Sequence, residues 1–247
     1  MLKLDSWLEI AKSAALKGGK YLLENQSNEQ KILLNQGRDI KLQLDADTER
    51  LIKDTLTSQS SFSILGEETG LSDDVGEFYW VVDPLDGTSN FLRNIPLSCV
   101  SIALMQNKTP ILGVIYDFNH DDLYFGHLKS KAFVNQTEIT VSSYAEKSQS
   151  TLVTGIPAKN NYLDSEFKQM ISDFQQWKKV RMIGSAAMAS IYVAAGKADT
   201  YKEDGIFLWD IAAGAAIVQA AGGVASITNM QDDYRVDALF TNQHLAS

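Results

Sequence analysis

Apolar residues in the first quarter of the chain recur with the spacing of two helices. Between residues 6 and 24, leucine, isoleucine and alanine return every three or four positions, as on the buried face of an α-helix. Asp5 or Ser6 can cap this helix, because either side chain accepts a hydrogen bond from a free backbone amide. Residues 47–56 repeat the helical spacing, whereas the largely polar stretch 26–38 predicts a loop or a hairpin.

Shorter apolar runs follow, separated by glycine and by an Asn-His-Asp segment. Runs of this length and punctuation predict strands. They lie at residues 62–65, 78–82, 97–105, 110–116, 122–127 and 131–134. This succession predicts a mostly antiparallel sheet packed on the two helices.

The second half of the chain alternates between strand-like and helix-like patterns of apolar residues. Strands are predicted at 151–154, 178–182 and 199–201, and helices at 163–176, 185–195 and 209–221, the last one followed by two glycines. The alternation indicates a second α/β layer. We therefore expect two closely packed halves, residues 1–142 and 143–247, without a flexible linker between them.

Composition and charge narrow the class of protein. The chain has 247 residues, of which 45% are hydrophobic, and a formal net charge of −9. That length supports a substantial core. The acidic balance argues against a nucleic-acid partner, which would need a basic surface, and it is consistent with a site that binds cations.

The single cysteine and the N-terminal sequence bear on location. Cys99 has no partner for a disulfide within the chain, and it lies in an apolar run, which predicts a buried thiol. The first residues lack the apolar core of a signal peptide, and no run reaches the roughly 18 apolar residues of a membrane span. We expect a cytoplasmic protein without a membrane partner.

The most informative segment runs from Trp80 to Phe91 and contains two carboxylates three residues apart. Asp83 and Asp86 follow a strand directly, and a Gly-Thr-Ser turn comes next. Two oxygen ligands beside such a turn suit a divalent cation that faces a phosphate. The same residue types also make an ordinary acidic turn, so this segment alone leaves both interpretations open.

Two further acids stand at the ends of predicted elements. Glu67 follows the strand at 62–65, and Asp210 begins an alanine-rich helix. Taken singly, Glu67 would be a solvated loop acid and Asp210 a helix N-terminal residue. Together with Asp83 and Asp86 they form four carboxylates at element ends, which is where α/β folds place their sites.

This set of motifs resembles the inositol monophosphatase family, whose members are metal-dependent, lithium-sensitive phosphatases. The matching segments are 39–45, 66–68, 83–91, 154–157, 181–187, 196–205 and 209–214, in family order. Three features depart from the family pattern. Leu42 replaces a threonine, Lys31 or Arg38 is a loose substitute for an upstream lysine, and the chain is short after Gly223.

The resemblance implies a layered αβαβα sandwich and a site with two or three Mg²⁺ ions. Its metal ligands would be Glu67, Asp83 and the backbone carbonyl of Leu85 for one ion, and Asp83, Asp86 and Asp210 for another. Glu67 and Thr88 would orient the attacking water, and Asp45 would polarise Thr88. The backbone amides of Gly87 and Thr88 would bind phosphate oxygens.

The resemblance also implies an inositol-phosphate phosphatase that forms a homodimer. Glu203 would accept hydrogen bonds from ring hydroxyls, although a solvated loop acid is the alternative, and Ala186 would line the wall beside the ring. Activity on adenosine 3′,5′-bisphosphate, fructose 1,6-bisphosphate or histidinol phosphate stays open on this scaffold. A non-catalytic binding relative is disfavoured, because the acidic motifs are intact.

A covalent nucleophile has little support in the sequence. The histidines at positions 120, 127 and 244 lie outside the motifs, and no Gly-x-Ser-x-Gly segment occurs. His120 is expected at the surface, and the other two as packing or surface residues. The predicted reaction is therefore hydrolysis of a phosphate monoester by a metal-activated water.

Overall fold

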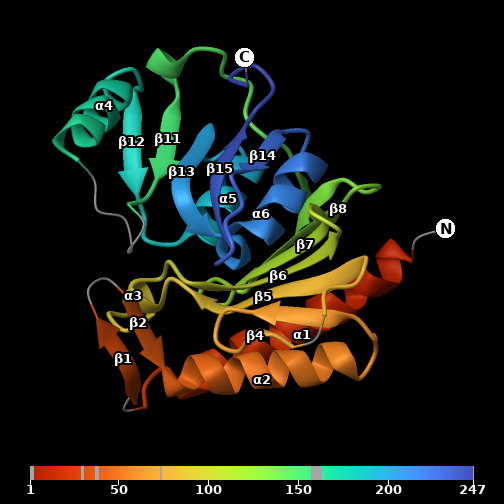
Figure 1. The fold of residues 1–247 in the computed structure, drawn as a ribbon. Coiled ribbons are helices and arrows are strands. Elements are labelled where there is room, and N and C mark those ends of the chain that lie inside the picture. Colours follow the sequence, from red (N-terminus) through yellow and green to blue (C-terminus); the bar gives the residue numbers. More distant parts are fainter. Residues whose placement is uncertain (1–2, 29–30, 37–38, 73, 157–162, 247) are drawn as a thin grey trace.

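The chain forms five alternating layers of helix and sheet (Figure 1). The computed structural model describes residues 3–28, 31–36, 39–72, 74–156 and 163–246. Its first sheet has eight strands in the order β10-β9-β8-β7-β6-β5-β3-β4, and its second has five in the order β12-β11-β13-β15-β14. Helices α1 and α2 cover the outer face of the first sheet, α5 and α6 separate the two sheets, and α4 lies beside β12 on the far side.

The first part of the chain builds two helices, a hairpin and the eight-stranded sheet. Its elements are α1 (Leu4–Asn25), β1 (Ile32–Gln36), β2 (Asp39–Leu42), α2 (Gln43–Thr57), β3 (Ser63–Gly66), β4 (Gly70–Leu71), β5 (Phe78–Asp86), α3 (Thr88–Phe91), β6 (Cys99–Gln106), β7 (Thr109–Asp117), β8 (Asp122–His127), β9 (Ala132–Val134) and β10 (Thr137–Ile139). The strands of the large sheet pair antiparallel, except for β3 and β5. The predicted mostly antiparallel sheet is confirmed, and the stretch 26–38 contributes to the hairpin β1–β2.

The second part of the chain builds the five-stranded sheet and the helices on its two faces. Its elements are a 3₁₀ turn (Lys147–Gln149), β11 (Thr151–Thr154), α4 (Asp164–Phe174), β12 (Lys179–Met182), α5 (Ala186–Ala194), β13 (Thr200–Phe207), α6 (Leu208–Ala220), β14 (Val224–Thr228) and β15 (Arg235–Thr241). β11 pairs parallel with both β12 and β13, whereas β15 pairs antiparallel with β13 and β14.

Two predicted element bounds were wrong in ways that matter for the site, and two strands near the end of the chain were missed. Helix α2 begins at Gln43 and not at residue 47, so Asp45 lies in its first turn, where its Oδ2 accepts the Leu42 amide at 2.8 Å. The strand predicted to end at Tyr201 continues to Phe207, because β15 pairs along its whole length. Strands β14 and β15, after Gly223, were not predicted at all.

Two apolar cores hold the layers together. One lies between the eight-stranded sheet and α1 and α2, and the other surrounds α5 and α6 between the sheets. In the second core, helix α6 packs closely against strand β7 at Gly113. A Cβ on this glycine would lie only 2.1 Å from the backbone oxygen of Ala213 on α6. This contact sets the position of α6 over the sheet, and with it the position of Asp210 in its first turn.

Among the helices that the structure describes, none combines the length and apolar character needed to cross a bilayer. Cys99 is buried at the start of β6, as its apolar surroundings predicted.

Candidate active site

The centre of the site is the end of β5, where the strand leaves its regular pairing with β6. Asp83 pairs with Ser101 and Asp86 with Cys99, so the register shifts between the two acids. Pro84 lies within this irregular stretch and cannot donate a ladder hydrogen bond. Irregular pairing of this kind re-aims side chains, which places both carboxylates at the same end of the sheet.

Gly87 follows Asp86 in the left-handed conformation, with φ 86° and ψ 34°. A Cβ at this position would lie 2.6 Å from the Leu97 carbonyl oxygen, so both backbone conformation and space require glycine. The turn continues into α3, where the Thr88 hydroxyl donates to the Leu85 carbonyl at 3.0 Å. Thr88 and Leu85, predicted as catalytic and ligating residues, are therefore in direct contact.

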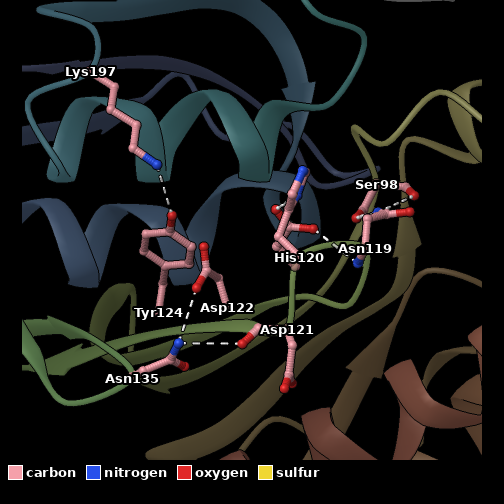
Figure 2. Close-up of polar contacts among 9 residues, drawn as sticks. Ser98, Asn119, His120, Asp121, Asp122, Tyr124, Asn135 and Lys197 are labelled. Carbon is pink, nitrogen blue, oxygen red and sulfur yellow. Dashed lines mark hydrogen bonds and ion pairs between the residues drawn. The ribbon is translucent and has the colours of Figure 1, made fainter.

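The segment 97–98, whose Leu97 carbonyl lies against Gly87, is hydrogen-bonded to the β7–β8 turn. Asn119 in that turn donates its side-chain amide to the Ser98 carbonyl at 2.9 Å (Figure 2). His120 beside it pairs with Asp117 at 2.8 Å and keeps 53% of its side chain exposed. The predicted surface position of His120 is confirmed, and this polar network supports the turn without joining the acidic cluster.

Asp86 is bound by the start of α5, which comes from the other half of the chain. The Ser185 hydroxyl donates to Asp86 Oδ2 at 2.5 Å, and the Ala187 amide donates to the same oxygen at 2.7 Å. Ser185 also caps α5 by accepting the Met188 amide at 3.1 Å. The sequence prediction did not single out Ser185, although a serine before an alanine-rich helix is a recognisable cap.

Asn90 makes a second link between the same two segments. Its side-chain amide donates to the Leu97 and Ile183 carbonyls, each at 2.8 Å. Asn90 therefore ties the turn after Asp86 to the segment before α5.

Asp210 completes the cluster from the first turn of α6. Asp83, Asp86 and Asp210 each offer a carboxylate oxygen, and these three oxygens lie within 4.8 Å of one another. Within the described part of the chain, no lysine or arginine forms an ion pair with any of the three. The structure thus brings together three of the predicted metal ligands from two distant segments.

The charges in this cluster repel one another. Burial raises the pKa of Asp83 well above its usual value, and the nearby charges of Glu67, Asp86 and Asp210 raise it further. Burial raises the pKa of Asp86 to about 6, although hydrogen bonds from Ser185 and from backbone amides oppose that rise. Burial and the neighbouring acids also raise the pKa of Asp210.

Glu67 lies next to this cluster at the end of β3. Its backbone amide donates to the Val82 carbonyl at 3.1 Å, directly before Asp83. Its side chain hydrogen-bonds to Asp83 and contributes to the high pKa of that residue. The fourth predicted ligand is therefore within reach of the other three.

Glu203 is not the solvated loop acid that was the alternative prediction. It lies on β13 with only 8% of its surface exposed, and the Tyr201 hydroxyl donates to its Oε2 at 3.0 Å. Burial raises the pKa of Glu203 to about 7. Its charge also raises the pKa of Asp210, so Glu203 borders the acidic cluster.

Three more predicted site residues are Ala186, Asp45 and Gly87. Ala186 is the buried first residue of α5, beside the Asp86 contact, and Asp45 is buried in α2. The backbone amide of Gly87 lies near the Asp86 carboxyl and lowers its pKa. Arg38 and Pro157, which belong to motifs noted in the sequence, lie outside the described residues.

The other two histidines also stay outside the cluster. His127 is buried and its Nε2 lies 3.1 Å from Asp5 Oδ1 on α1, whereas His244 is exposed near the end of the chain. No histidine within the described residues joins the three clustered aspartates. The site therefore presents oxygen ligands only, which suits a hard divalent cation.

Comparison with known proteins agrees with this geometry. The model of the inositol monophosphatase family matches residues 3–244. Inositol-1-monophosphatase from Synechocystis sp. is 37% identical over 228 residues, which cover 90% of this chain and 79% of that relative. A protein from Aquifex aeolicus named fructose-1,6-bisphosphatase/inositol-1-monophosphatase is 32% identical over 231 residues, covering 92% and 88%.

A solved structure of a relative has the same fold. The inositol monophosphatase from Anabaena (Nostoc) sp. superposes with a TM-score of 0.82 at 33% identity, covering 98% of this chain and 92% of that chain. The predicted layered sandwich is therefore confirmed. The match extends over nearly the whole chain, and so the protein belongs to the inositol monophosphatase family and is a phosphoric monoester hydrolase.

Proposed function

We propose that this enzyme hydrolyses inositol monophosphate, or a closely similar polyol monophosphate, to the alcohol and phosphate. The observation that carries the proposal is the cluster of Asp83, Asp86 and Asp210. Three carboxylate oxygens lie within 4.8 Å of one another, with no ion-pair partner within the described residues. Such an arrangement is costly unless a cation offsets the repulsion.

The donor set fits Mg²⁺. Carboxylate and carbonyl oxygens are the ligands that this ion prefers. We propose that Glu67, Asp83 and the Leu85 carbonyl hold one ion, that Asp83, Asp86 and Asp210 hold a second, and that a third can join them. When bound, the ions lower the pKa of a coordinated water and offset the negative charge of the phosphate.

The protein's own groups would orient the attacking water. The Thr88 hydroxyl has one proton and donates it to Leu85, so its oxygen is left to accept a hydrogen bond from water. We propose that Glu67 accepts the second proton of that water. The polarising role of Asp45 on Thr88 stays a prediction from the family resemblance.

The phosphate would sit against the turn after Asp86. We propose that the Thr88 amide, at the start of α3, donates to a phosphate oxygen. We propose the same role for the Gly87 amide, which lies near the Asp86 carboxyl.

Glu203 supports the choice of a polyol. A buried carboxyl group beside the cluster can bind neutral ring hydroxyls, and its negative charge would repel a second phosphate. The Tyr201 hydroxyl holds Glu203 in one orientation at 3.0 Å. We propose Ala186, at the start of α5, as a wall of the same pocket.

A second candidate substrate is fructose 1,6-bisphosphate, because the relative from Aquifex aeolicus carries both names. The two candidates are separated by comparing phosphate release from inositol 1-phosphate, fructose 1,6-bisphosphate, adenosine 3′,5′-bisphosphate and histidinol phosphate. We expect the highest kcat/KM for inositol 1-phosphate. A higher value for a bisphosphate would reverse the assignment of the substrate.

The same assay tests the metal. Excess chelator should abolish phosphate release, Mg²⁺ should restore it, and Li⁺ should inhibit the restored activity. Full activity in excess chelator would contradict the whole proposal. A cytoplasmic homodimer without nucleic-acid or membrane partners stays a prediction from the sequence, and sedimentation of the purified protein would test the dimer.

A further inference from the structure

A buried glutamate on α2 lies directly behind the loop that carries Glu67. Glu49 has no exposed surface, and it contacts that loop from helix α2. A carboxylate without access to water is costly unless charge and hydrogen bonds compensate it. The contacts of Glu49 therefore indicate what it stabilises.

The carboxylate of Glu49 binds the residues that follow Glu67. Its Oε2 accepts the Glu68 amide at 2.8 Å, and its Oε1 accepts the Thr69 hydroxyl at 2.5 Å. Lys53, one turn further along α2, lies 3.2 Å from Glu49 Oε1 and also donates to the Thr69 hydroxyl. Three hydrogen bonds from Glu49 and Lys53 thus fix the chain immediately after Glu67.

The residue before Glu67 is shaped to admit the same carboxylate. A Cβ on Gly66 would lie 2.5 Å from the carboxylate carbon of Glu49 and from both of its oxygens. Any side chain at position 66 would therefore displace Glu49 or the strand end. Together with the amide of Glu67, which donates to Val82, these contacts hold the backbone on both sides of Glu67.

We infer that Glu49, supported by Lys53, is a positioning residue that sets Glu67 in place as a metal ligand. Glu49 itself touches neither the substrate nor the acidic cluster in this arrangement; it acts through the loop 66–69. The inference rests on the proposed role of Glu67 as a metal ligand. It predicts that changes at Glu49 weaken metal binding before they affect the rest of the site.

The test is the Mg²⁺ dissociation constant of purified variants, measured by titration calorimetry, with the melting temperature recorded beside it. Glu49→Gln keeps the size of the side chain, but it loses the charge that pairs with Lys53 and places an amide donor against the loop. Loss of an outer contact to a metal ligand costs about 10- to 100-fold in metal affinity. We expect Glu49→Gln to raise the Mg²⁺ dissociation constant at least tenfold.

Thr48→Ala is the matched control. Thr48 is the neighbouring residue on α2, it is equally buried, and its hydroxyl bonds only to the helix backbone at Leu44 in the described structure. This variant should lower the melting temperature while the dissociation constant stays within twofold of the parent. A Glu49→Gln protein whose dissociation constant also stays within twofold would overturn the inference.

A double variant separates this inference from the proposed function. If Glu49 acts through Glu67, then Glu49→Gln combined with Glu67→Gln should bind Mg²⁺ no more weakly than Glu67→Gln alone. A further tenfold loss in the double variant would overturn the inference. If Glu67→Gln binds Mg²⁺ as tightly as the parent, the proposed ligand set itself is wrong.

An exposed position keeps the test usable if Glu49→Gln does not fold. Thr69→Ala removes one hydrogen bond to Glu49 from a residue at the surface. Glu49 keeps its contacts with the Glu68 amide and with Lys53 in this variant, so we expect only part of the full effect of a charge-assisted hydrogen bond, a rise in the Mg²⁺ dissociation constant of roughly fivefold. An unchanged constant in a folded Thr69→Ala protein would count against the inference.

Discussion

Carboxylates near the loop that carries Glu67 occur in two different settings, one at the buried Glu49 and the other in the cluster of Asp83, Asp86 and Asp210. Glu49 is matched by a lysine, a backbone amide and a hydroxyl, all at hydrogen-bond distance. Asp83, Asp86 and Asp210 face one another without an ion-pair partner among the described residues. The same functional group is therefore used in two opposite ways within one region.

The difference distinguishes a carboxylate that stabilises the fold from one that binds a ligand. Glu49 has its compensation within the chain, so removing its charge takes an acceptor from the Glu68 amide, from the Thr69 hydroxyl and from the partly buried Lys53. Burial and mutual repulsion raise the pKa values of the aspartate cluster, because the chain supplies hydrogen bonds to it but no positive charge. We take the missing positive charge as the signature of the site.

The largest effect that would break or support this comparison is expected at Asp83. Asp83→Asn should lower kcat/KM at least about 100-fold, and more than Thr88→Ala does, because the charge shared by both proposed metal positions is lost. In excess chelator the same variant should raise the melting temperature, since it removes a repelling charge. The measurements are phosphate release with Mg²⁺ and thermal unfolding without it.

In the same unfolding experiment, Glu49→Gln should lower the melting temperature, whereas Asp83→Asn should raise it. Breaking a buried pair costs about 3–5 kcal/mol, so the melting temperature of Glu49→Gln should fall with or without metal. If Asp83→Asn lowers the metal-free melting temperature as Glu49→Gln does, the two sets of carboxylates are alike and the comparison fails.

The second effect, in order of size, concerns Glu203 and the substrate. A charge-assisted hydrogen bond is worth roughly 1.5–3 kcal/mol, so Glu203→Gln should lower kcat/KM for inositol 1-phosphate about ten- to a hundredfold. A small aryl phosphate makes no ring contacts and should be hydrolysed at nearly the original rate. Equal losses on both substrates would show that Glu203 serves the cluster or the fold and does not bind the ring.

The last effect is a dependence of stability on pH. Burial raises the pKa of Glu203 from its ordinary 4.5 to about 7, so the folded state holds this proton more tightly than the unfolded state. The stabilisation is complete below pH 4.5 and is lost as the pH rises through 7. Its full size is about 3 kcal/mol, at 1.36 kcal/mol for each pKa unit.

Unfolding by urea in chelator at pH 5 and pH 8 measures this term. The aspartate cluster contributes in the same direction in every protein, so the informative quantity is the difference between the two pH values. That difference should shrink in Glu203→Gln, and it should stay unchanged in Glu9→Gln, which alters an exposed acid on α1. An equal difference in the parent and in Glu203→Gln would show that Glu203 titrates like an exposed acid.

The elements that were predicted correctly are those whose pattern is local. Helix α1, six of the eight strands of the large sheet and the alanine-rich helices α5 and α6 follow from periodicity and from the residues at their ends. Strands β4 and β10 were missed because they are very short, and β14 because it is partly exposed; β15 was also missed, and it is stabilised by its pairing with β13 and β14. The length of β13 was misjudged for the same reason.

By itself, the sequence determined the order of the motifs, the acids at the ends of strands and the family to which the chain belongs. These features depend on neighbouring residues, and a linear pattern records them. Only the tertiary structure decided which acids meet, because Asp86 binds Ser185 across 99 residues and Asp210 reaches the cluster from α6. It also decided that Glu203 is buried and that Glu49 supports the Glu67 loop. Burial and long-range contacts depend on how whole layers pack, and no local pattern of residues encodes that.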